Sequence, residues 1–380
     1  MVSDRYNAFL HCDERAASGE GPLADVTVGV KANIAVEGMP FHAGIGAWQD
    51  RVAVADAEVV RRLRDAGAAI VGILNMEEAA LGAKTDNPHF GPTHNPHRDG
   101  YSPGGSSGGS GAAVAAGLCN VALGTDTMGS VRIPAAHCGV YGFKPATDRV
   151  SQDGLLRADP SLDAIGPLAR DLDLLQKVAR IVSDFGEIEI AGSGATLVDH
   201  GVEVHPEVAA VFAQALAALP DQPAEARLSE SNSRIRYAGF IEVSRWLSEE
   251  LAGVAVSDRL GQLLTYGPSR PEKKLALDMD VLNQTLLEIQ QIVAKHGFLI
   301  LPTVPNPPFA HSEAEPAAQA DFTCLANVAG LPAISIPGGW TQDALPIGVQ
   351  IIGASGAEAG LFRLARHLDT KLGAYRAPKI

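Results

Sequence analysis

The chain has 380 residues, of which 46% are hydrophobic and 19% are charged, so it can bury a large core and is not a disordered chain. Its formal net charge is −14, and its lysines and arginines form no cluster. We therefore expect no nucleic-acid partner and no membrane surface as a partner, because both require gathered positive charge.

The N-terminus has no basic start followed by a long apolar stretch, so we expect no signal peptide and a cytoplasmic protein. Residues 101–125 carry no charge, but glycines and a proline interrupt them, so we do not expect them to span a membrane. The cysteines form no C-x-x-C pair, which argues against a zinc ribbon and a redox motif.

The first regular elements alternate between strand and helix. Residues 27–36, TVGVKANIAV, predict a strand that runs into a loop. Asp56 begins a helix whose apolar positions share one face, and residues 68–75 predict the next strand. This alternation indicates a parallel sheet with helices on its faces.

The same patterns continue to the end of the chain. Further strands are expected at 120–126, 140–144, 298–304, 332–337 and 347–353. Further helices are expected at 108–118, 171–182, 206–219, 238–252, 276–295 and 358–372. No internal repeat or clear linker divides the chain. The sequence therefore predicts one α/β domain with a helical insertion at 186–297.

Residues 102–111, SPGGSSGGSG, are unusually rich in glycine and serine. A flexible linker is disfavoured, because a linker joins two independent cores whereas this segment runs directly into an apolar helix. A phosphate-binding loop is disfavoured, because no lysine follows the last glycine and G-x-G-x-x-G is absent from its usual setting. The third interpretation is a rigid loop that holds a reactive hydroxyl.

A reactive serine needs a base, and two distant segments supply the required residue types. Ser130 follows a predicted strand in LGTDTMGSVRIPA, and Lys31 lies at the end of the strand VTVGVK. A buried lysine with a lowered pKa can remove the proton from a serine hydroxyl. The spacing G-x-S-x-G occurs at 104–108, but a loop and not a predicted strand precedes it, so it does not indicate the nucleophile elbow of a Ser–His–Asp hydrolase. Taken alone, Lys31 also fits a solvated strand end, and the serines fit ordinary turns.

Three segments together resemble the signature of the amidase signature family of Ser–Ser–Lys amide hydrolases: GGSSGGSGAAVAAGL, LGTDTMGSVRIPA and CGVYGFKPA. Ser106 and Ser130 are 24 residues apart, as that signature requires. GVKANIAVEGMP, at 29–40, resembles the segment that carries the family lysine. The resemblance implies one α/β domain over 1–380, with a mixed, mostly parallel central sheet covered by helices on both faces. It also implies that the insertion at 186–297 shapes the pocket.

By this resemblance, Ser130 is the nucleophile, and Ser106 relays its proton to the neutral amine of Lys31. The peptide bond between Gly105 and Ser106 is expected to be cis. The oxyanion hole is expected from the backbone N–H groups of Thr127, Met128, Gly129 and Ser130.

Supporting roles are expected for two charged residues beside the nucleophile. Asp126 is expected to hold the turn by accepting backbone hydrogen bonds. Arg132 is either a structural ion-pair partner or a group that binds a substrate carboxylate. The chain departs from the family at Ala32, where an aspartate is common, and at Met128, where a glycine is common.

The substrate is the least determined feature. Pocket walls are expected from Met76, Phe90, Tyr101, Met128, Arg236, Trp246 and Phe309, with core packing or solvent exposure as the alternative for each. Arg236 is a candidate for binding an anionic group. His89, His94 and His97 share one loop, but their spacing predicts no metal site.

The first functional hypothesis is an amidase that converts a small-molecule amide to an acid plus ammonia or an amine, without a cofactor. One alternative is hydrolysis of carboxylated urea or urethane bonds by the same residues. The others are a glutaminase subunit of an amidotransferase and a binding subunit without catalytic activity. The possibility of a homodimer is left open.

Overall fold

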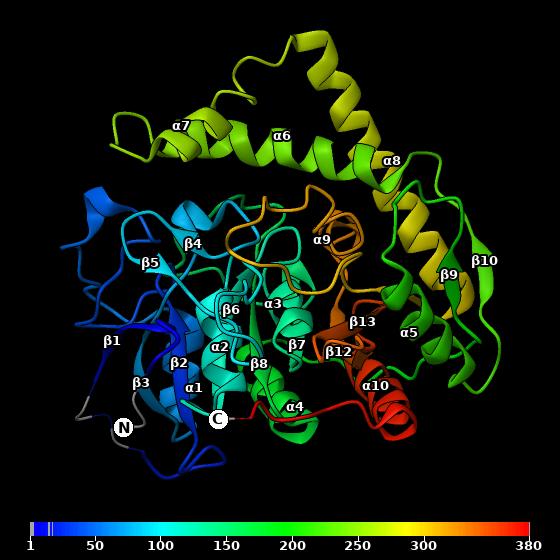
Figure 1. Ribbon diagram of the computed structural model, residues 1–380, viewed down its shortest axis with the longest axis horizontal. Helices are drawn as coiled ribbons and strands as arrows, with labels where there is room; N and C mark the ends of the chain where they lie inside the picture. The colour runs from blue at the N-terminus through cyan, green and yellow to red at the C-terminus, as the bar shows by residue number, and fades with distance from the viewer. Residues whose placement is uncertain (1–3, 14–15, 17, 380) are drawn as a thin grey trace.

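The computed structural model describes residues 4–13, 16 and 18–379. Within them, an eleven-stranded sheet has the order β1-β3-β2-β6-β8-β7-β12-β13-β11-β9-β10 (Figure 1). Its strands are β1 Phe9–Cys12, β2 Thr27–Lys31, β3 Ala69–Leu74, β6 Val121–Asp126, β7 Tyr141–Lys144, β8 Ala164–Ala169, β9 Ala195–Leu197, β10 Ala224–Ala226, β11 Phe298–Pro302, β12 Ala333–Trp340 and β13 Pro346–Gly353. A small separate hairpin consists of β4 Asp86–Asn87 and β5 Gly91–Pro92.

Helices cover both faces of this sheet. They are α1 Glu58–Asp65, α2 Gly108–Ala115, α3 Arg132–His137, α4 Leu172–Val182, α5 Pro206–Ala217, α6 Asn232–Glu250, α7 Asp258–Leu264, α8 Glu272–His296, α9 Cys324–Val328 and α10 Glu358–Leu372. The neighbours Leu168 and Ala169 of β8 belong to two different apolar cores, because successive strand residues point to opposite faces. The Leu168 core includes α2 and α3, and the Ala169 core includes α1, α4 and α10. None of the described helices combines the length and apolar character needed to cross a bilayer.

The predicted α/β fold with a mixed sheet is confirmed. β2 and β3 are parallel and joined through α1, as the strand–helix–strand pattern indicated. Parallel pairs also join β2 to β6 and β9 to both β10 and β11. The strands between these groups pair antiparallel, so parallel neighbours do not form the expected majority. The short 341–345 connection between β12 and β13 permits only antiparallel pairing, since a parallel pair needs a long crossover.

Some elements have no clear sequence signal. β8 was not predicted, because Pro167 interrupts its pattern, and proline is disfavoured inside a central strand. β9 and β10 are only three residues long, which is too short for a period of two to be read. Helix α6 begins at Asn232, six residues before the predicted start at 238, because Ser231 caps it by accepting from Arg234 N.

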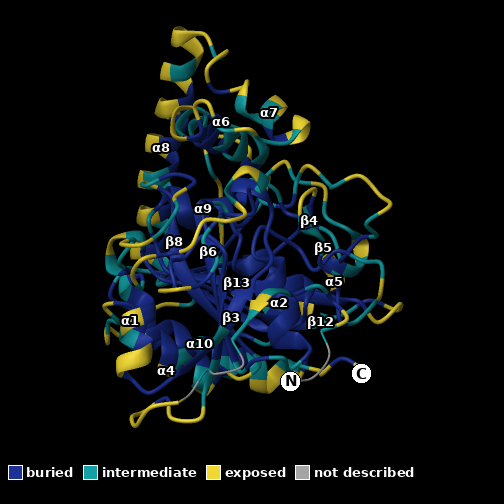
Figure 2. Ribbon diagram, turned by 90° about the vertical axis from the view of Figure 1, so that its left-hand side faces the viewer, coloured by how far each residue is buried: buried dark blue, intermediate teal, exposed yellow. Residues whose placement is uncertain are grey.

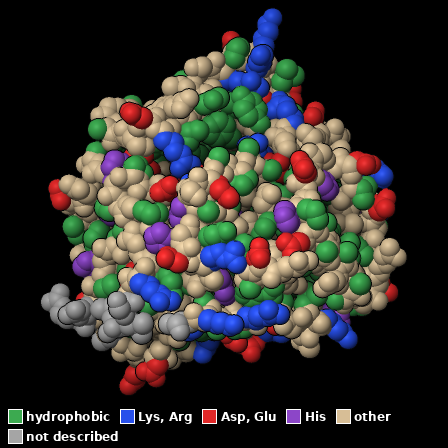
Figure 3. All heavy atoms as spheres, viewed as in Figure 1, with side chains coloured by type: hydrophobic (Ala, Val, Ile, Leu, Met, Phe, Trp, Pro, Cys, Tyr) green, Lys and Arg blue, Asp and Glu red, His purple; other side chains and the backbone are tan. Residues whose placement is uncertain are grey.

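The segment 186–297 contains α5, α6, α7 and α8, and also β9 and β10 of the central sheet. In Figure 1, α6, α7 and the start of α8 lie as a layer above the sheet. Figure 2 shows that this layer has exposed outer surfaces, whereas the strands beneath it are buried. Hydrophobic side chains also gather over α6 on the face seen in Figure 3.

Candidate active site

The site lies where two parallel strands end at the same edge of the sheet. β2 ends at Lys31, and its neighbour β6 ends at Asp126. Ligand and catalytic sites of open α/β sheets commonly lie beyond such carboxyl ends. Helix α2 packs against both strands, which places the preceding loop at this edge.

Lys31 is completely buried and points at a serine. Its Nζ lies 2.8 Å from Ser106 Oγ and 2.7 Å from Thr125 Oγ1. Burial lowers the pKa of the Lys31 amine to about 7, and the nearby carboxylates of Asp163 and Asp126 only partly oppose this shift. A substantial fraction of Lys31 is therefore unprotonated at neutral pH, as a general base requires.

The glycine-rich loop is rigidly held rather than flexible. All residues from 102 to 111 are buried, and the Gly105–Ser106 peptide bond is cis, as expected. Thr85 Oγ1 donates to Gly104 O at 2.8 Å and accepts from Gly108 N at 3.0 Å. A Cβ at Gly109 would lie 2.4 Å from Asn75 O, so the close packing of α2 requires a glycine there. The linker interpretation is therefore excluded.

The turn 127–130 presents backbone donors without acceptors. Its carbonyls are held from outside the turn: Met128 O accepts from Thr323 Oγ1 at 2.7 Å, and Gly129 O accepts from Ile133 N at 2.7 Å. None of its four N–H groups donates a hydrogen bond to another described residue. Gly129 has φ +135°, and a Cβ there would lie 2.1 Å from Thr323 Oγ1, so only glycine fits.

A fully buried ion pair supports this turn from below. Arg132 donates to both carboxylate oxygens of Asp126, at 3.0 and 2.8 Å, and also to Gln350 Oε1 and Asn327 Oδ1. Burial by itself raises the pKa of the Asp126 carboxyl, but Arg132 outweighs it and lowers that pKa to about 2. Asp126 also accepts from Val131 N at 3.2 Å, directly after the turn.

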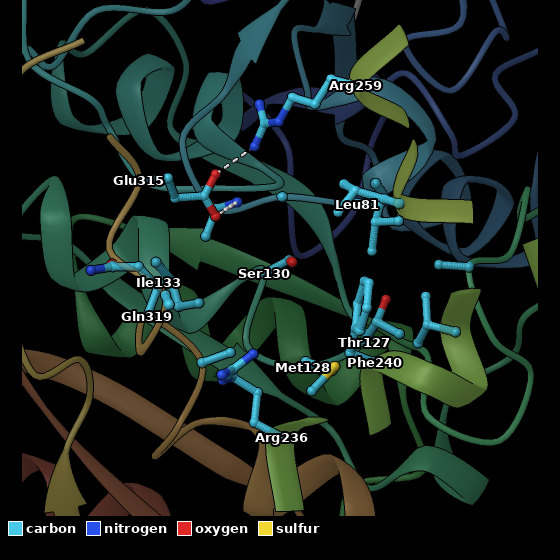
Figure 4. A pocket seen from close by; sticks show the side chains of 18 residues that line it. Leu81, Thr127, Met128, Ser130, Ile133, Arg236, Phe240, Arg259, Glu315 and Gln319 are labelled. Atoms are coloured by element: carbon cyan, nitrogen blue, oxygen red, sulfur yellow. Dashed lines mark hydrogen bonds and ion pairs between the residues drawn. The ribbon is translucent and has the colours of Figure 1, made fainter. Parts of the chain in front are cut away.

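A cavity of about 320 Å³ opens above Ser130, between the sheet edge and the α6–α7 layer (Figure 4). Its wall is largely apolar. The lining residues are Ala80, Leu81, Gly82, Ala83, Thr127, Met128, Ser130, Ile133, Ala158, Arg236, Phe240, Val243, Arg259, Leu263, Glu315, Ala317, Gln319 and Ala320. The cavity thus joins Ser130 and the free N–H groups to a space large enough for a small organic molecule.

Comparison with known proteins shows which family this chain belongs to. The amidase family model matches residues 7–187 and 191–362. The chain belongs to the amidase family. It is 33% identical to a glutamyl-tRNA(Gln) amidotransferase subunit of Methanothermobacter thermautotrophicus, covering 96% of this chain and 92% of that relative.

Solved structures agree with this assignment. The structure of a glutamyl-tRNA(Gln) amidotransferase subunit from Thermotoga maritima has a TM-score of 0.88 and 29% identity, covering 99% of this chain and 91% of that one. A structure described as an amidase has a TM-score of 0.87 and 29% identity, covering 97% and 92%. The resemblance to the amidase signature family is thereby confirmed, and the protein is an enzyme that acts on C–N amide bonds.

In this amidase, the structure brings together the three residues predicted from the motifs. Lys31 and Ser106 are hydrogen-bonded, and Ser107 N donates to Ser130 O at 3.3 Å, which holds the two serine segments side by side. The hydroxyl of Ser130 makes no hydrogen bond to another described residue and opens into the cavity. Met128, predicted as a pocket residue, does line the cavity.

Arg236 also lines the cavity, but five other predicted pocket residues do not. The expectation is wrong for Met76, which is fully buried in the core, and for Phe90, which stacks on the His42 ring with centroids 4.4 Å apart. It is also wrong for Tyr101, which lies under the guanidinium of Arg98.

Trp246 and Phe309 likewise lie outside the cavity wall. Trp246 lies on α6 three residues after Val243, but unlike Arg236 and Val243 it does not line the cavity. Phe309 is buried against the ring of His137. Aromatic character alone therefore did not distinguish pocket residues from packed residues.

The histidines of the 87–105 loop serve local contacts. His89 Nε2 lies 3.0 Å from Glu78 Oε1, and His97 Nε2 lies 2.9 Å from Cys138 O. Within the described part of the chain, no group of three His, Cys, Asp or Glu side chains is placed to hold a metal ion. Arg132 is completely enclosed, so of its two predicted roles the ion pair is the one observed.

Sequence reasoning missed several wall residues. Arg259 of α7 forms an ion pair with Glu315 at 2.6 Å, and Glu315 accepts from Ala83 N at 2.9 Å. Gln319 lies in the turn before α9. No local pattern marks these positions, because they meet only through packing of segments far apart in the chain.

Proposed function

We propose that this protein hydrolyses a small-molecule carboxylic amide through an acyl-enzyme on Ser130. The observation that carries the proposal is the 2.8 Å contact between Lys31 Nζ and Ser106 Oγ, two residues without exposed surface. With its pKa lowered to about 7, the amine of Lys31 is the base that this contact connects to a serine hydroxyl.

In the first step, Ser130 Oγ adds to the carbonyl carbon of the amide. Its proton passes to Ser106 Oγ as the proton of Ser106 passes to Lys31 Nζ. The carbonyl oxygen becomes an oxyanion and accepts hydrogen bonds from the unpaired N–H groups of residues 127–130. The carbonyls of Met128, Gly129 and Ser130 are already held, so these donors are fixed before the substrate binds. Losing one such donor typically costs about 3 kcal/mol.

In the second step, the C–N bond breaks and the leaving nitrogen takes the proton from Lys31 through Ser106. Ammonia or an amine departs, and the acyl group remains as an ester on Ser130. Water then adds to the ester carbon and gives its proton to the same relay. When this intermediate collapses, the proton returns to Ser130 Oγ and the carboxylic acid is released.

The names of the amidotransferase relatives favour a second candidate, a glutaminase subunit that works with a partner chain. In that case the same residues release ammonia from glutamine. The structure described as an amidase and the amidotransferase structure have the same sequence identity to this chain, 29%. This equal identity supports keeping the stand-alone enzyme as the first candidate.

The test uses purified protein and a panel of amides, with detection of both ammonia and amine. The panel contains short aliphatic amides, benzamide, an anilide, glutamine, a carboxylated urea and a simple carbamate. We expect turnover of at least one simple amide that is absent in Ser130→Ala. Turnover of glutamine alone, and only after a partner chain is added, would replace the first candidate with the second.

A further inference from the structure

Gln319 carries a polar side chain that the protein leaves unsatisfied. It is 2% exposed, and neither its amide oxygen nor its amide nitrogen has a hydrogen-bond partner among the described residues. Within those residues, it is the only one that both lines the Ser130 cavity and carries such a buried, unpaired side-chain atom. Figure 4 places it beside Ile133, on the wall of the space that holds Ser130.

An unpaired buried amide is costly, so its presence calls for a physical reason. Leaving a buried polar group without a partner costs about 1–3 kcal/mol, and native proteins pair nearly all of them. The position of Gln319 in a cavity wall supplies a reason, since a bound molecule can provide the missing hydrogen bonds. To reach such a molecule, the Gln319 amide has to turn about its side-chain torsions, of which the terminal one is the least restricted.

The charges of the cavity wall indicate what kind of molecule this is. Arg236 is already paired with Asp321, and Arg259 is already paired with Glu315. Each of these two guanidinium groups is therefore already compensated by a carboxylate, so a substrate carboxylate would meet no excess positive charge in this wall. The remaining wall is mostly alanine and larger apolar side chains, including Leu81, Met128, Ile133, Phe240, Val243 and Leu263. The wall therefore suits an uncharged molecule with an apolar body.

We propose that Gln319 is a specificity-determining residue that binds a second, uncharged polar group of the substrate, namely a carboxamide or ureido group. The proposal rests on the proposed amidase function and adds to it the class of substrate. A carboxamide matches Gln319 because each offers an acceptor oxygen and an N–H donor to the other. The substrate is then a neutral molecule with an apolar middle, whose reacting amide lies at Ser130 and whose second polar group lies at Gln319.

The test compares three series of linear compounds of roughly four to eight carbon atoms, a size range that a cavity of this volume accepts. The series are α,ω-diamides, monoamides of equal chain length, and the same monoamides with a terminal carboxylate. Ammonia release is measured for wild type, Gln319→Met, Gln319→Glu and the surface control Gln342→Met. Met removes the hydrogen-bonding atoms at nearly constant size, and Glu keeps the shape while adding a charge.

We expect wild type to prefer at least one diamide over its matched monoamide and its carboxylate by about tenfold or more in kcat/KM, which corresponds to one good hydrogen bond. Both Gln319 variants should lose this preference, measured within each variant as the ratio of kcat/KM for the diamide to kcat/KM for its matched monoamide, and Gln342→Met should keep it. An unchanged preference in both variants, or a wild-type preference for the carboxylates, would overturn the proposal. Absence of turnover on every amide in wild type would instead overturn the proposed function itself.

Discussion

Lys31 Nζ and Ser106 Oγ lie 2.8 Å apart, and neither residue has any exposed surface. The two residues are far apart in the chain, and the packing of α2 against the parallel strands β2 and β6 brings the loop of Ser106 to the edge where Lys31 lies. The same burial that excludes water from the contact also lowers the pKa of Lys31 to about 7. The burial of Lys31 therefore accounts both for its contact with Ser106 and for its lowered pKa.

The lowered pKa of Lys31 predicts how activity depends on pH. The proposed base is neutral Lys31, which becomes protonated as the pH falls below about 7. We therefore expect kcat/KM to decrease on the acid side with an apparent pKa near 7, as measured over a pH series with an amide substrate. Lys31→Arg, which stays protonated, should be inactive at every pH. A flat profile between about pH 5 and pH 8 would contradict the role of Lys31 as the base.

Removing any member of the relay should abolish turnover without unfolding the protein. We expect Lys31→Ala, Ser106→Ala and Ser130→Ala each to lower kcat on the order of a thousandfold or more, as in other hydrolases whose residues act as a unit. Ser110→Ala is a matched control, because this buried serine follows the same loop and bonds only to the backbone oxygen of Leu123. Circular dichroism checks the fold of each variant, and near-wild-type turnover in Lys31→Ala would contradict the assignment.

Gly129→Ala should damage the turn that carries the free N–H groups. The new Cβ would lie 2.1 Å from Thr323 Oγ1, so the turn has to move and its donors lose their alignment. We expect kcat to fall about a hundredfold, the loss typical of one oxyanion donor. Gly330→Ala is the control: Gly330 also has positive φ, +69°, but its Cβ would meet nothing within 4 Å. If Gly129→Ala and Gly330→Ala change kcat by the same factor, the close contact between residue 129 and Thr323 does not position the turn.

Arg132→Met should lower stability strongly, because it leaves the buried Asp126 carboxylate without its partner. The expected loss in the free energy of unfolding is about 3–5 kcal/mol, measured by urea denaturation. Arg61→Met, which removes an exposed pair with Glu58, should leave the urea midpoint nearly unchanged, because solvent screens such pairs.

The lowered pKa of Asp126 sets the pH range of this effect. Its contribution to stability is complete above the unfolded pKa of about 4 and is lost as the pH falls toward 2. A wild-type advantage over Arg132→Met that does not shrink in this range would show that the ion pair is not its source.

The proposed relay uses only side chains and backbone N–H groups, so chelators should not affect it. We expect incubation with EDTA to leave kcat unchanged, as measured on the substrate found in the panel. Loss of activity that an added metal ion restores would contradict the proposed mechanism.

The three residues of the proposed relay could be selected from the sequence because the motifs that carry them are local. Ser106 and Ser130 lie in short segments whose glycines, spacing and following helices are written in consecutive residues, and Lys31 ends a clearly apolar strand. The elements around them, α1, β3, α4 and α10, have periodic apolar patterns and were found close to their observed bounds. β8 was missed because Pro167 breaks its local pattern. Its pairing with β6 holds this segment as a strand, and that pairing cannot be read from consecutive residues.

The sequence by itself determined the fold class and the family and pointed to the three residues of the proposed relay, because motifs and periodic patterns are written along the chain. Only the tertiary structure decided the cavity wall and the pairing of its charges. Arg236, Arg259, Glu315 and Gln319 come from α6, α7 and the connection after β11, and no period relates them. Which side chains meet there depends on how the α6–α7 layer packs over the sheet edge. For that reason Phe90 and Trp246 were expected in the wall, whereas Gln319 was not.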